Sequence, residues 1–305
     1  MKILVTGGSG MVGRNIVELL KKKGFNILHP TSDEVNLLNK KVVKNYILGT
    51  NPEMIIHCAG KVGGIQANIN NPISFLYENT QIGLNMLMSS YESGIDNFMN
   101  LSSSCMYPRN IKSPLNEDSI LSGELEPTNE GYAIAKITST RLCEYINKED
   151  NKFKYKTIIP CNLYGKYDKF DSKNSHMIPA VIKKIHEAKV NNQDTIDIWG
   201  DGQARREFMY VEDLANFINY AIERFDIIPQ NINVGLGHDY PINEYYNTIA
   251  EVIGYRGRFI HDLSKPVGME QKLIDNTRLI EFGWKHKTSL KEGIQKTYDF
   301  YLNDI

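Results

Sequence analysis

Lys2-Ile-Leu-Val-Thr-Gly-Gly-Ser-Gly-Met-Val-Gly13 is a short apolar run followed by a glycine-rich turn and the start of a helical pattern. A turn between a buried strand and a helix leaves backbone N–H groups free at the helix start, where they can bind a pyrophosphate. The glycine spacing alone is a weak signal, and the order of strand, turn and helix strengthens it. We therefore predict a dinucleotide-binding turn formed by Gly7, Gly10, Met11, Val12 and Gly13.

Apolar runs alternate with helical patterns through the first half of the chain. This alternation predicts an α/β fold with a Rossmann-like, doubly wound parallel sheet. In such a sheet, active residues lie at the carboxyl ends of the strands. The predicted strands are Lys2–Thr6, Asn26–His29, Met54–Cys58, Asn97–Leu101 and Lys156–Ile159, and the predicted helices are Met11–Lys23, Lys40–Leu48, Pro72–Gly94 and Gly131–Asn147.

The pattern loosens after Pro160, and Tyr164–Ser175 shows no clear period. Later strands are predicted at Ile196–Trp199, Glu207–Val211 and Asn231–Val234, and later helices at Glu212–Phe225, Asn243–Ile253 and Leu290–Leu302. We expect a smaller, discontinuous α/β substrate domain in the C-terminal half. The predicted division is residues 1–163 plus about 207–237 for the dinucleotide-binding domain, about 164–206 plus 238–288 for the nucleotide-sugar domain, and 289–305 for a C-terminal helix.

The composition is that of an ordinary soluble protein, with 41% hydrophobic and 23% charged residues among 305. The formal net charge of −1 argues against nucleic acid or a membrane surface as a partner. The four cysteines are too few for a disulfide framework and lack metal-ligand spacing. The chain enters the glycine turn without room for a signal peptide, and so we expect a cytoplasmic protein with reduced thiols and no metal.

Tyr132 and Lys136 are four residues apart on a predicted helix, and so they share one face of it. An ammonium group there can lower the pKa of the phenol, and Ser103, at the end of a predicted strand, can complete a proton-transfer site. Tyr132 would protonate the developing alkoxide and Ser103 would bind the carbonyl. Sequence periodicity leaves open which of Ser102, Ser103 and Ser104 faces the site. An exposed Tyr/Lys pair is the structural alternative.

Cys105 lies two residues beyond Ser103, on the same face if the segment is extended. A thiolate beside a carbonyl could remove an α-proton, although a lone cysteine is equally well explained as a core residue. His176 could donate or accept a proton near neutral pH. Arg206 and Lys272 could bind a diphosphate, with solvated surface charge as the alternative.

The segment after the second strand, His29-Pro-Thr-Ser-Asp-Glu34, usually contacts the adenine ribose. An acidic residue there favours NAD and a basic residue favours NADP, but no arginine is present and Asp33 comes late in the segment. Thr31 or Ser32 could hydrogen-bond to either form of the ribose. This segment alone does not decide between the two cofactors.

The chain resembles GDP-L-fucose synthase, the GDP-4-keto-6-deoxymannose 3,5-epimerase/4-reductase family of the extended short-chain dehydrogenase/reductase superfamily. The resemblance runs nearly end to end. The runs Lys61-Val-Gly-Gly-Ile65 and Ser103-Ser-Cys-Met-Tyr-Pro108 are its most specific motifs. Further matches are Gly10-Met-Val-Gly13, Asp33-Glu-Val-Asn-Leu-Leu38, Leu125-Glu-Pro-Thr-Asn-Glu130, Tyr132-Ala-Ile-Ala-Lys136, Asn162-Leu-Tyr-Gly165, Asn174-Ser-His-Met-Ile-Pro-Ala180 and Arg206-Glu-Phe208.

The resemblance implies a role for each candidate. Ser103, Tyr132 and Lys136 match the reductase triad, Cys105 the epimerisation base and His176 the epimerisation acid. It also implies NADPH (NADP+) as cofactor, with NADH not excluded, a GDP-linked 4-keto sugar as substrate, and a homodimer built through the helices around Pro72–Gly94 and Gly131–Asn147. The implied substrate-binding residues are Asn162, Arg206 and Lys272, and we add Trp199, at the end of a predicted strand.

The chain departs from the family where Ser9 and Ser32 replace arginines that can hold the NADPH 2′-phosphate. Changes near Ser264 and Gln271 leave room for a different sugar, such as a GDP-4-keto-heptose in surface polysaccharide synthesis. Three alternatives therefore stand beside the bifunctional enzyme. They are a C4 reductase of a GDP-ketoheptose, a 4-epimerase or 4,6-dehydratase that recycles NAD, and a non-catalytic dinucleotide-binding regulator.

Overall fold

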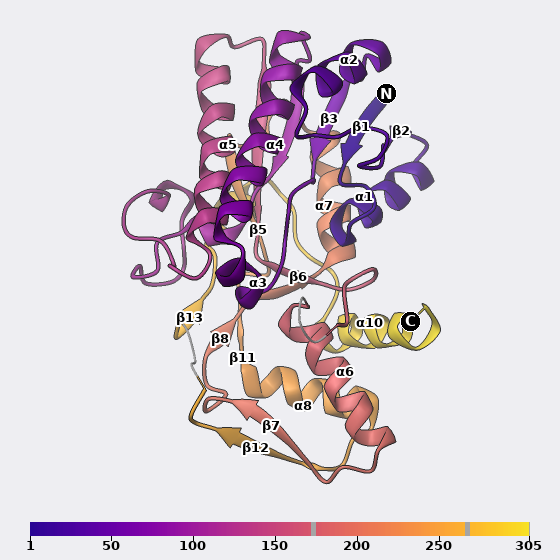
Figure 1. Cartoon of the computed structure of the whole chain (residues 1–305), viewed down its shortest axis with the longest axis vertical. Coiled ribbons are helices and arrows are strands. Elements are labelled where there is room, and N and C mark those ends of the chain that lie inside the picture. The colour runs from indigo at the N-terminus through magenta and orange to yellow at the C-terminus, as the bar shows by residue number, and fades with distance from the viewer. Residues whose placement is uncertain (172–174, 266–268, 305) are drawn as a thin grey trace.

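A computed structural model describes residues 1–171, 175–265 and 269–304, and its centre is a six-stranded parallel sheet (Figure 1). The strand order is β10-β5-β4-β3-β1-β2. From β1 the chain moves outward to β2 and then crosses back to β3, so the topological switch point lies between β1 and β3. The predicted doubly wound fold is confirmed. The bounds are β1 Lys2–Thr6, β2 Asn26–Leu28, β3 Met54–His57, β4 Asn97–Leu101, β5 Lys154–Pro160 and β10 Asn231–Val234.

Helices cover both faces of this sheet, as a parallel sheet requires (Figure 1). Because side chains alternate along a strand, Ile3 and Val5 join the core under α1 and α7, and Leu4 joins the core on the opposite face. The helices are α1 (Met11–Lys22) and α7 (Val211–Ile222) on one face and α2 (Lys40–Thr50), α4 (Pro72–Glu92) and α5 (Glu130–Glu149) on the other.

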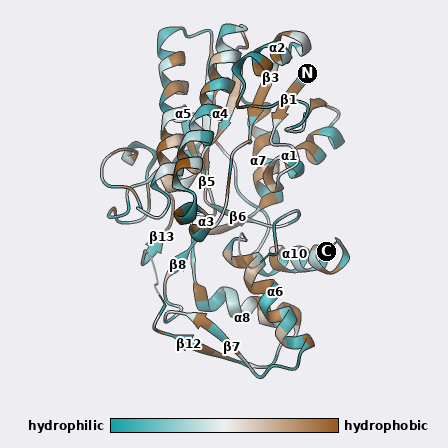
Figure 2. Ribbon diagram, in the orientation of Figure 1, coloured by the Kyte–Doolittle hydropathy of each residue, from teal (hydrophilic) through white to brown (hydrophobic). Residues whose placement is uncertain are grey.

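A second hydrophobic core lies beyond the carboxyl edge of the sheet, in the lower part of Figure 1. Ile182, Ile249 and Ile294 are fully buried in it, one from each of three helices. Brown, apolar stretches are visible in α6 and α8 in Figure 2. The elements are α6 (Met177–Val190), β7 (Thr195–Trp199), α8 (Ile242–Ile253), β12 (Arg258–Asp262) and α10 (Leu290–Asp304).

Short elements connect the two cores. A three-stranded sheet in the order β11-β8-β13 lies between the central sheet and the second core (Figure 1). Strand β6 pairs in parallel with β9. The bounds are β6 Asn162–Tyr164, β8 Arg205–Arg206, β9 Phe208–Tyr210, β11 Tyr240–Pro241 and β13 Gln271–Lys272, with α3 Ile65–Asn70, α9 Thr277–Glu281 and 3-10 turns at Ser104–Met106 and Glu117–Ser119.

Two features of the C-terminal half differ from the prediction. Helix α6 was not predicted; it contains Pro179 in its first turn, where a proline is tolerated because that backbone N–H would have no intrahelical partner. The strand predicted at Glu207–Val211 is the shorter β9, and β8 just before it was not predicted; Glu207 between the two strands is buried. Most ends of the predicted elements shift by only one or two residues.

Within the described ranges, no helix combines the length and apolar character needed to cross a membrane. The same residues contain no group of three or more His, Cys, Asp or Glu side chains arranged to hold a metal ion.

The turn after β1 depends on close backbone approach. Gly7 has φ +71°, and a Cβ there would lie 2.7 Å from the backbone nitrogen of Ala59. A Cβ on Gly13 would lie 2.2 Å from the Gly7 carbonyl oxygen. The Gly10 N–H donates to that carbonyl at 3.0 Å, which closes the turn. Side chains at these two glycines would therefore push the turn apart.

We predict that Gly13→Ala lowers the free energy of unfolding by about 1–3 kcal/mol, because the new methyl group meets backbone atoms that cannot yield without moving the turn. Gly49→Ala in α2 is the matched control, since nothing lies within 4 Å of its Cβ position. That change should raise stability by about 0.5–1 kcal/mol, because alanine is the better helix former. Urea unfolding of both variants measures the difference, and equal stability of the two would contradict the packing described for Gly13.

Candidate active site

The segment after β4 places Ser103 on the open side of the site and its two serine neighbours inside. Ser102 is buried, and its hydroxyl donates to the Met106 sulfur at 2.9 Å. Ser104 is also buried. The Ser103 hydroxyl oxygen accepts the backbone N–H of Cys105 at 3.3 Å and so caps the 3-10 turn. The expected extended segment is therefore wrong, and the proximity of Ser103 and Cys105 comes from this cap.

Cys105 is buried, and burial raises the pKa of its thiol. Three neighbours oppose that shift: the Lys272 ammonium, a hydrogen bond with Ser103, and the Lys136 ammonium. Two cations therefore stand where they can stabilise a thiolate in a site with little water. The other three cysteines are also free thiols, and none of them lies beside this combination of groups.

Tyr132 and Lys136 lie one turn apart in α5, as expected. Burial raises the pKa of Tyr132, and the nearby Cys105 raises it further. The Lys136 Nζ donates to the Leu101 carbonyl at 2.8 Å and lies 5.7 Å from the centre of the Tyr132 ring. Burial lowers the pKa of Lys136. Burial thus dominates the pKa of the phenol here, and a lowering of that pKa by Lys136 stays a prediction.

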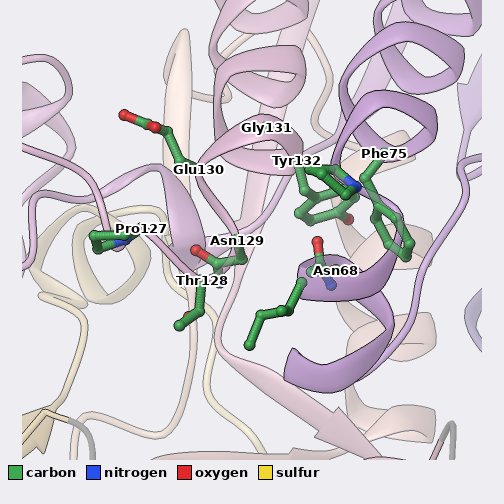
Figure 3. A pocket seen from close by; sticks show the side chains of 10 residues that line it. Asn68, Phe75, Pro127, Thr128, Asn129, Glu130, Gly131 and Tyr132 are labelled. Carbon is green, nitrogen blue, oxygen red and sulfur yellow. The ribbon is translucent and has the colours of Figure 1, made fainter.

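Tyr132 lines a cavity of about 210 Å³ between α3, the start of α4 and the start of α5 (Figure 3). Its ring packs edge-on against Phe75, with 6.4 Å between the ring centres. The other lining residues are Asn68, Ile69, Pro72, Pro127, Thr128, Asn129, Glu130 and Gly131. The phenol therefore borders a space that a small ring can enter.

The loop after β3 connects the central sheet to the second half of the site. Buried Asn79 holds this loop by accepting the Lys61 backbone N–H at 2.7 Å and donating to the Lys61 carbonyl at 3.1 Å. A Cβ on Gly60 would lie 3.8 Å from the Lys136 Nζ, and a Cβ on Gly64 would lie 3.5 Å from the Ser175 carbonyl oxygen. The loop thus spans from Lys136 to the residue before His176.

His176 precedes the first residue of α6 and does not cap the helix with its side chain. Its Nδ1 lies 3.7 Å from Oδ1 of Asp168, whose side chain is buried. No hydrogen bond of this imidazole occurs among residues 1–171, 175–265 and 269–304. Through Gly64 and Ser175 it belongs to the same edge as Lys136.

Arg206 and Lys272 are register partners on adjacent strands β8 and β13. Burial lowers the pKa of both side chains, and the positive charge of Arg206 lowers that of Lys272 further. The neighbouring Arg205 is different, because it forms an ion pair with Asp239, with Nε to Oδ1 at 2.7 Å. No ion pair of Arg206 or Lys272 occurs among the described residues. Two adjacent half-buried cations without a carboxylate partner there suit a diphosphate.

Glu207 holds these strands in place. Its carboxylate accepts the backbone N–H groups of Leu236 at 2.5 Å, Gly237 at 3.0 Å and Ile274 at 3.1 Å. Burial raises its pKa to about 7, although these hydrogen bonds act in the opposite direction. Asn162 donates to the Glu207 carbonyl at 3.0 Å. One buried side chain thus links the end of β10 to the segment that follows Lys272.

Trp199 ends β7 on the far side of the second core and is 60% exposed. The Lys265 ammonium lies 5.6 Å from the centre of its ring. Among the described residues, no contact joins Trp199 to Ser103, Cys105 or Tyr132. Its assignment to the substrate site stays a prediction.

The segment after β2 combines a nearby cation with an acid, Glu34, that is engaged within its own loop. Lys21 Nζ lies 2.7 Å from Nε2 of His29. Glu34 instead accepts the backbone N–H of Thr31 at 2.7 Å and its hydroxyl at 3.0 Å. Ser32 is exposed in this turn. A negatively charged ribose substituent would meet Lys21 here rather than an arginine.

Sequence reasoning missed four residues of this region: Lys21, Asn79, Asp168 and Glu207. Lys21 lies within a helical pattern, on a different element from His29, and Asp168 lies in the stretch without a period. Glu207 was taken as part of a strand. For Asn79, Asp168 and Glu207 the telling feature is a polar side chain that is buried, and burial is known only from the fold.

Comparison with known proteins agrees with this geometry. The model of the NAD dependent epimerase/dehydratase family matches residues 3–235. A GDP-L-colitose synthase of Yersinia pseudotuberculosis is 60% identical over 304 residues, covering 100% of this chain and 99% of the relative. A GDP-L-fucose synthase of Azorhizobium caulinodans is 49% identical over 301 residues, covering 99% and 96%.

Solved structures give the same grouping. A GDP-mannoheptose C4 reductase from Campylobacter jejuni with NADP bound superposes with a TM-score of 0.90 at 31% identity, covering 99% of this chain and 98% of that one. The agreement extends over both cores and the segments between them. The chain therefore belongs to the NAD dependent epimerase/dehydratase family, in the group that contains GDP-L-colitose and GDP-L-fucose synthases.

Proposed function

We propose that the chain is an NADPH-dependent enzyme that epimerises a GDP-linked 4-keto-6-deoxy sugar and then reduces its ketone, giving an L-sugar nucleotide of the colitose or fucose type. The observation that carries this is the placement of Cys105 beside both Ser103 and Lys272, with Tyr132 in electrostatic contact. A base, a ketone-binding hydroxyl, a proton donor and a phosphate-binding cation thus occupy one buried site. The names of the relatives at 60% and 49% identity support the substrate class.

The epimerisation begins at the carbon next to the C4 ketone. Cys105 as thiolate removes the proton there, and the electron pair moves toward the carbonyl oxygen to give an enolate. Ser103 and Tyr132 donate hydrogen bonds to that oxygen. His176 returns a proton from the opposite face, which inverts the carbon and restores the ketone.

The reduction uses the same oxygen-binding groups. Because burial raises the pKa of Tyr132, its phenol stays protonated at neutral pH and can give its proton to the C4 alkoxide. The nicotinamide cofactor supplies the hydride when it is bound. The residues that would hold it are Gly7, Gly10, Met11, Val12 and Gly13 around the pyrophosphate, with Lys136, Tyr132 and Ser32 along its length.

The cofactor turn fits a dinucleotide because it lies at the switch point and its glycines allow a close approach of the backbone to the pyrophosphate. NADPH is favoured over NADH by Lys21 beside His29, and by the engagement of Glu34 within its own loop. The solved heptose reductase with NADP bound supports the same cofactor.

The substituent at C3 distinguishes a colitose-type from a fucose-type sugar. Colitose lacks the 3-hydroxyl group that fucose carries, so a colitose-type substrate has a methylene at C3 and only C5 can be inverted. A fucose-type substrate offers both carbons. A GDP-4-keto-heptose is the second candidate, favoured by the solved C4 reductase that this chain resembles in fold. Retention of both Cys105 and His176 favours an enzyme that epimerises.

We also propose that the second core with its short sheets forms the nucleotide-sugar domain, with the boundaries predicted from the sequence. The diphosphate would meet Arg206 and Lys272, with Asn162 and Trp199 toward the rest of the nucleotide-sugar. A homodimer through α4 and α5 is proposed because these helices expose Ile73 at 82%. Tyr77, Ile134 and Tyr145 on the same helix pair are exposed as well.

The function is tested in deuterated water with NADPH and, separately, GDP-4-keto-6-deoxymannose, its 3-deoxy counterpart and a GDP-4-keto-heptose. We expect oxidation of NADPH, followed by absorbance, and deuterium at the inverted carbon, followed by proton NMR. Use of only the 3-deoxy sugar, labelled at C5, would assign the colitose type. Labels at C3 and C5 would assign the fucose type. Reduction of any of these sugars without label would refute the epimerase half of the proposal.

Cys105→Ser in the same experiment should abolish label at the epimerised carbon and leave NADPH binding intact, since the alcohol is too weak an acid to replace the thiol as a base. The control is Cys143→Ala, which removes a thiol from the core under α5. This variant should retain the label. Retained exchange in Cys105→Ser would exclude this thiol as the base.

The exchange reaction should depend on pH with a definite sign. Burial raises the pKa of Cys105, so at neutral pH only a small fraction is thiolate, and that fraction rises about tenfold per pH unit below the pKa. We therefore expect kcat/KM for exchange to increase from pH 6.5 toward pH 8.5, because this parameter reports the free enzyme. A flat profile over this range would contradict the assignment of the buried Cys105 thiol as the base.

The cofactor preference is tested with Lys21→Met, which removes the cation next to His29. The KM for NADPH should rise about tenfold or more, as expected for one hydrogen bond to a charged group. The KM for NADH should change little. Lys22→Met, an exposed neighbour in the same helix, is the control. Equal effects on both cofactors would exclude Lys21 from 2′-phosphate recognition.

A further inference from the structure

The carboxylate of Asp168 is buried without full hydrogen bonding. The residue is 8% exposed, and Oδ1 accepts the backbone N–H of Lys169 at 2.8 Å. Oδ2 is buried and has no hydrogen-bond partner in the part of the chain that the structure describes. Burying a carboxylate oxygen without a donor is costly, and such groups often serve a site. Asp168 therefore calls for a functional explanation.

The imidazole of His176 lies close to this carboxylate. The distance from Nδ1 to Oδ1 is 3.7 Å, which is within ion-pair range and beyond a hydrogen bond. Hydrogen bonds at catalytic groups commonly shorten when substrate binds. The His176 side chain is 43% exposed, so the face away from Asp168 can reach both substrate and water.

The loop that carries Asp168 is fixed to elements other than α6. Asn15 in α1 donates to the Lys166 carbonyl at 3.0 Å. The Tyr167 hydroxyl bonds to Glu18 of α1, and the Arg14 guanidinium lies 3.7 Å from the centre of the Tyr167 ring. The Asp168 N–H donates to the Gly165 carbonyl at 3.1 Å, which closes the turn. The loop that carries the carboxylate is thus tied to α1 of the central sheet, and His176 lies at the start of α6 in the second core.

We propose that Asp168 is the positioning residue of the epimerisation acid: it holds the His176 ring through Nδ1 and directs Nε2 at the sugar. This inference rests on the proposed function. In the step, the electron pair of the enolate forms the new C–H bond with the Nε2 proton, and the oxygen returns to the ketone. The imidazolium becomes neutral imidazole, which keeps its Nδ1 proton toward Asp168 and regains the Nε2 proton from water.

The arrangement gives Asp168 a signature that a purely structural residue lacks. The base on one face can remove a proton, exchange it with solvent and return a deuteron to the same face. Inversion needs the acid on the other face. A misplaced acid therefore leaves exchange in place and removes inversion.

The test compares Asp168→Asn with wild type in deuterated water, using the sugar that the wild type inverts, with NADP+ in place of NADPH. Proton NMR gives the rate of deuterium entry and the rate of inversion separately. We expect inversion to fall about tenfold or more, in the range of a general acid's contribution, while exchange stays within about twofold. Asp168→Glu should recover part of the inversion, since it restores the charge.

Asp226→Asn is the matched control, because it removes a carboxylate from an exposed ion pair with Lys154. It should leave both rates unchanged. Unchanged inversion in Asp168→Asn would overturn the proposal, and so would an equal fall of exchange and inversion, which indicates a structural role. Absence of exchange in the wild type would refute the proposed function itself and is seen before any variant is made.

Discussion

The site depends on one constraint: adjacent parallel strands end at the same edge of the sheet. β1, β3 and β4 are all parallel in the register of the central sheet. The glycine turn, the loop after β3 and the serine–cysteine segment must therefore meet at one edge. Gly7 and Ala59 show this most clearly, because the backbones of the turn after β1 and the loop after β3 are in direct contact there. A cofactor turn and a catalytic segment about ninety residues apart thus become neighbours.

The second half of the site is joined to this edge by a buried charge. The Glu207 carboxylate binds three backbone N–H groups from two distant segments, which offsets much of the cost of burying it. Arg206 is its neighbour in sequence, and Lys272 is the register partner of Arg206; the described residues form no ion pair with either cation. The same local structure therefore fixes the domain contact and the proposed diphosphate site.

Burial favours the protonated form of both the proposed acid and the proposed base, which suits the acid and opposes the base. Desolvation keeps the Tyr132 phenol protonated, as a proton donor should be, and it works against the Cys105 thiolate. The base therefore needs compensating charge, and Lys272 and Lys136 are the two cations that lower its pKa. Lys272 would then act on both the diphosphate and the thiol. The pairing of the short strand β13 with β8 places Lys272 for this double role.

The sequence alone determined the parallel sheet, its helices, the glycine turn and the Ser103, Cys105, Tyr132 and Lys136 set, because strand and helix periods and short motifs are local properties. The tertiary structure decided what depends on contacts between distant segments. It turned Ser103 rather than Ser102 or Ser104 to the site, paired the two-residue strands β8 and β13, and set Asp168 opposite His176. Two-residue strands have no period, and a buried carboxylate is recognised only once its burial is known. Local patterns thus specify elements and motifs, and the packing of distant elements specifies the partners and protonation of each group.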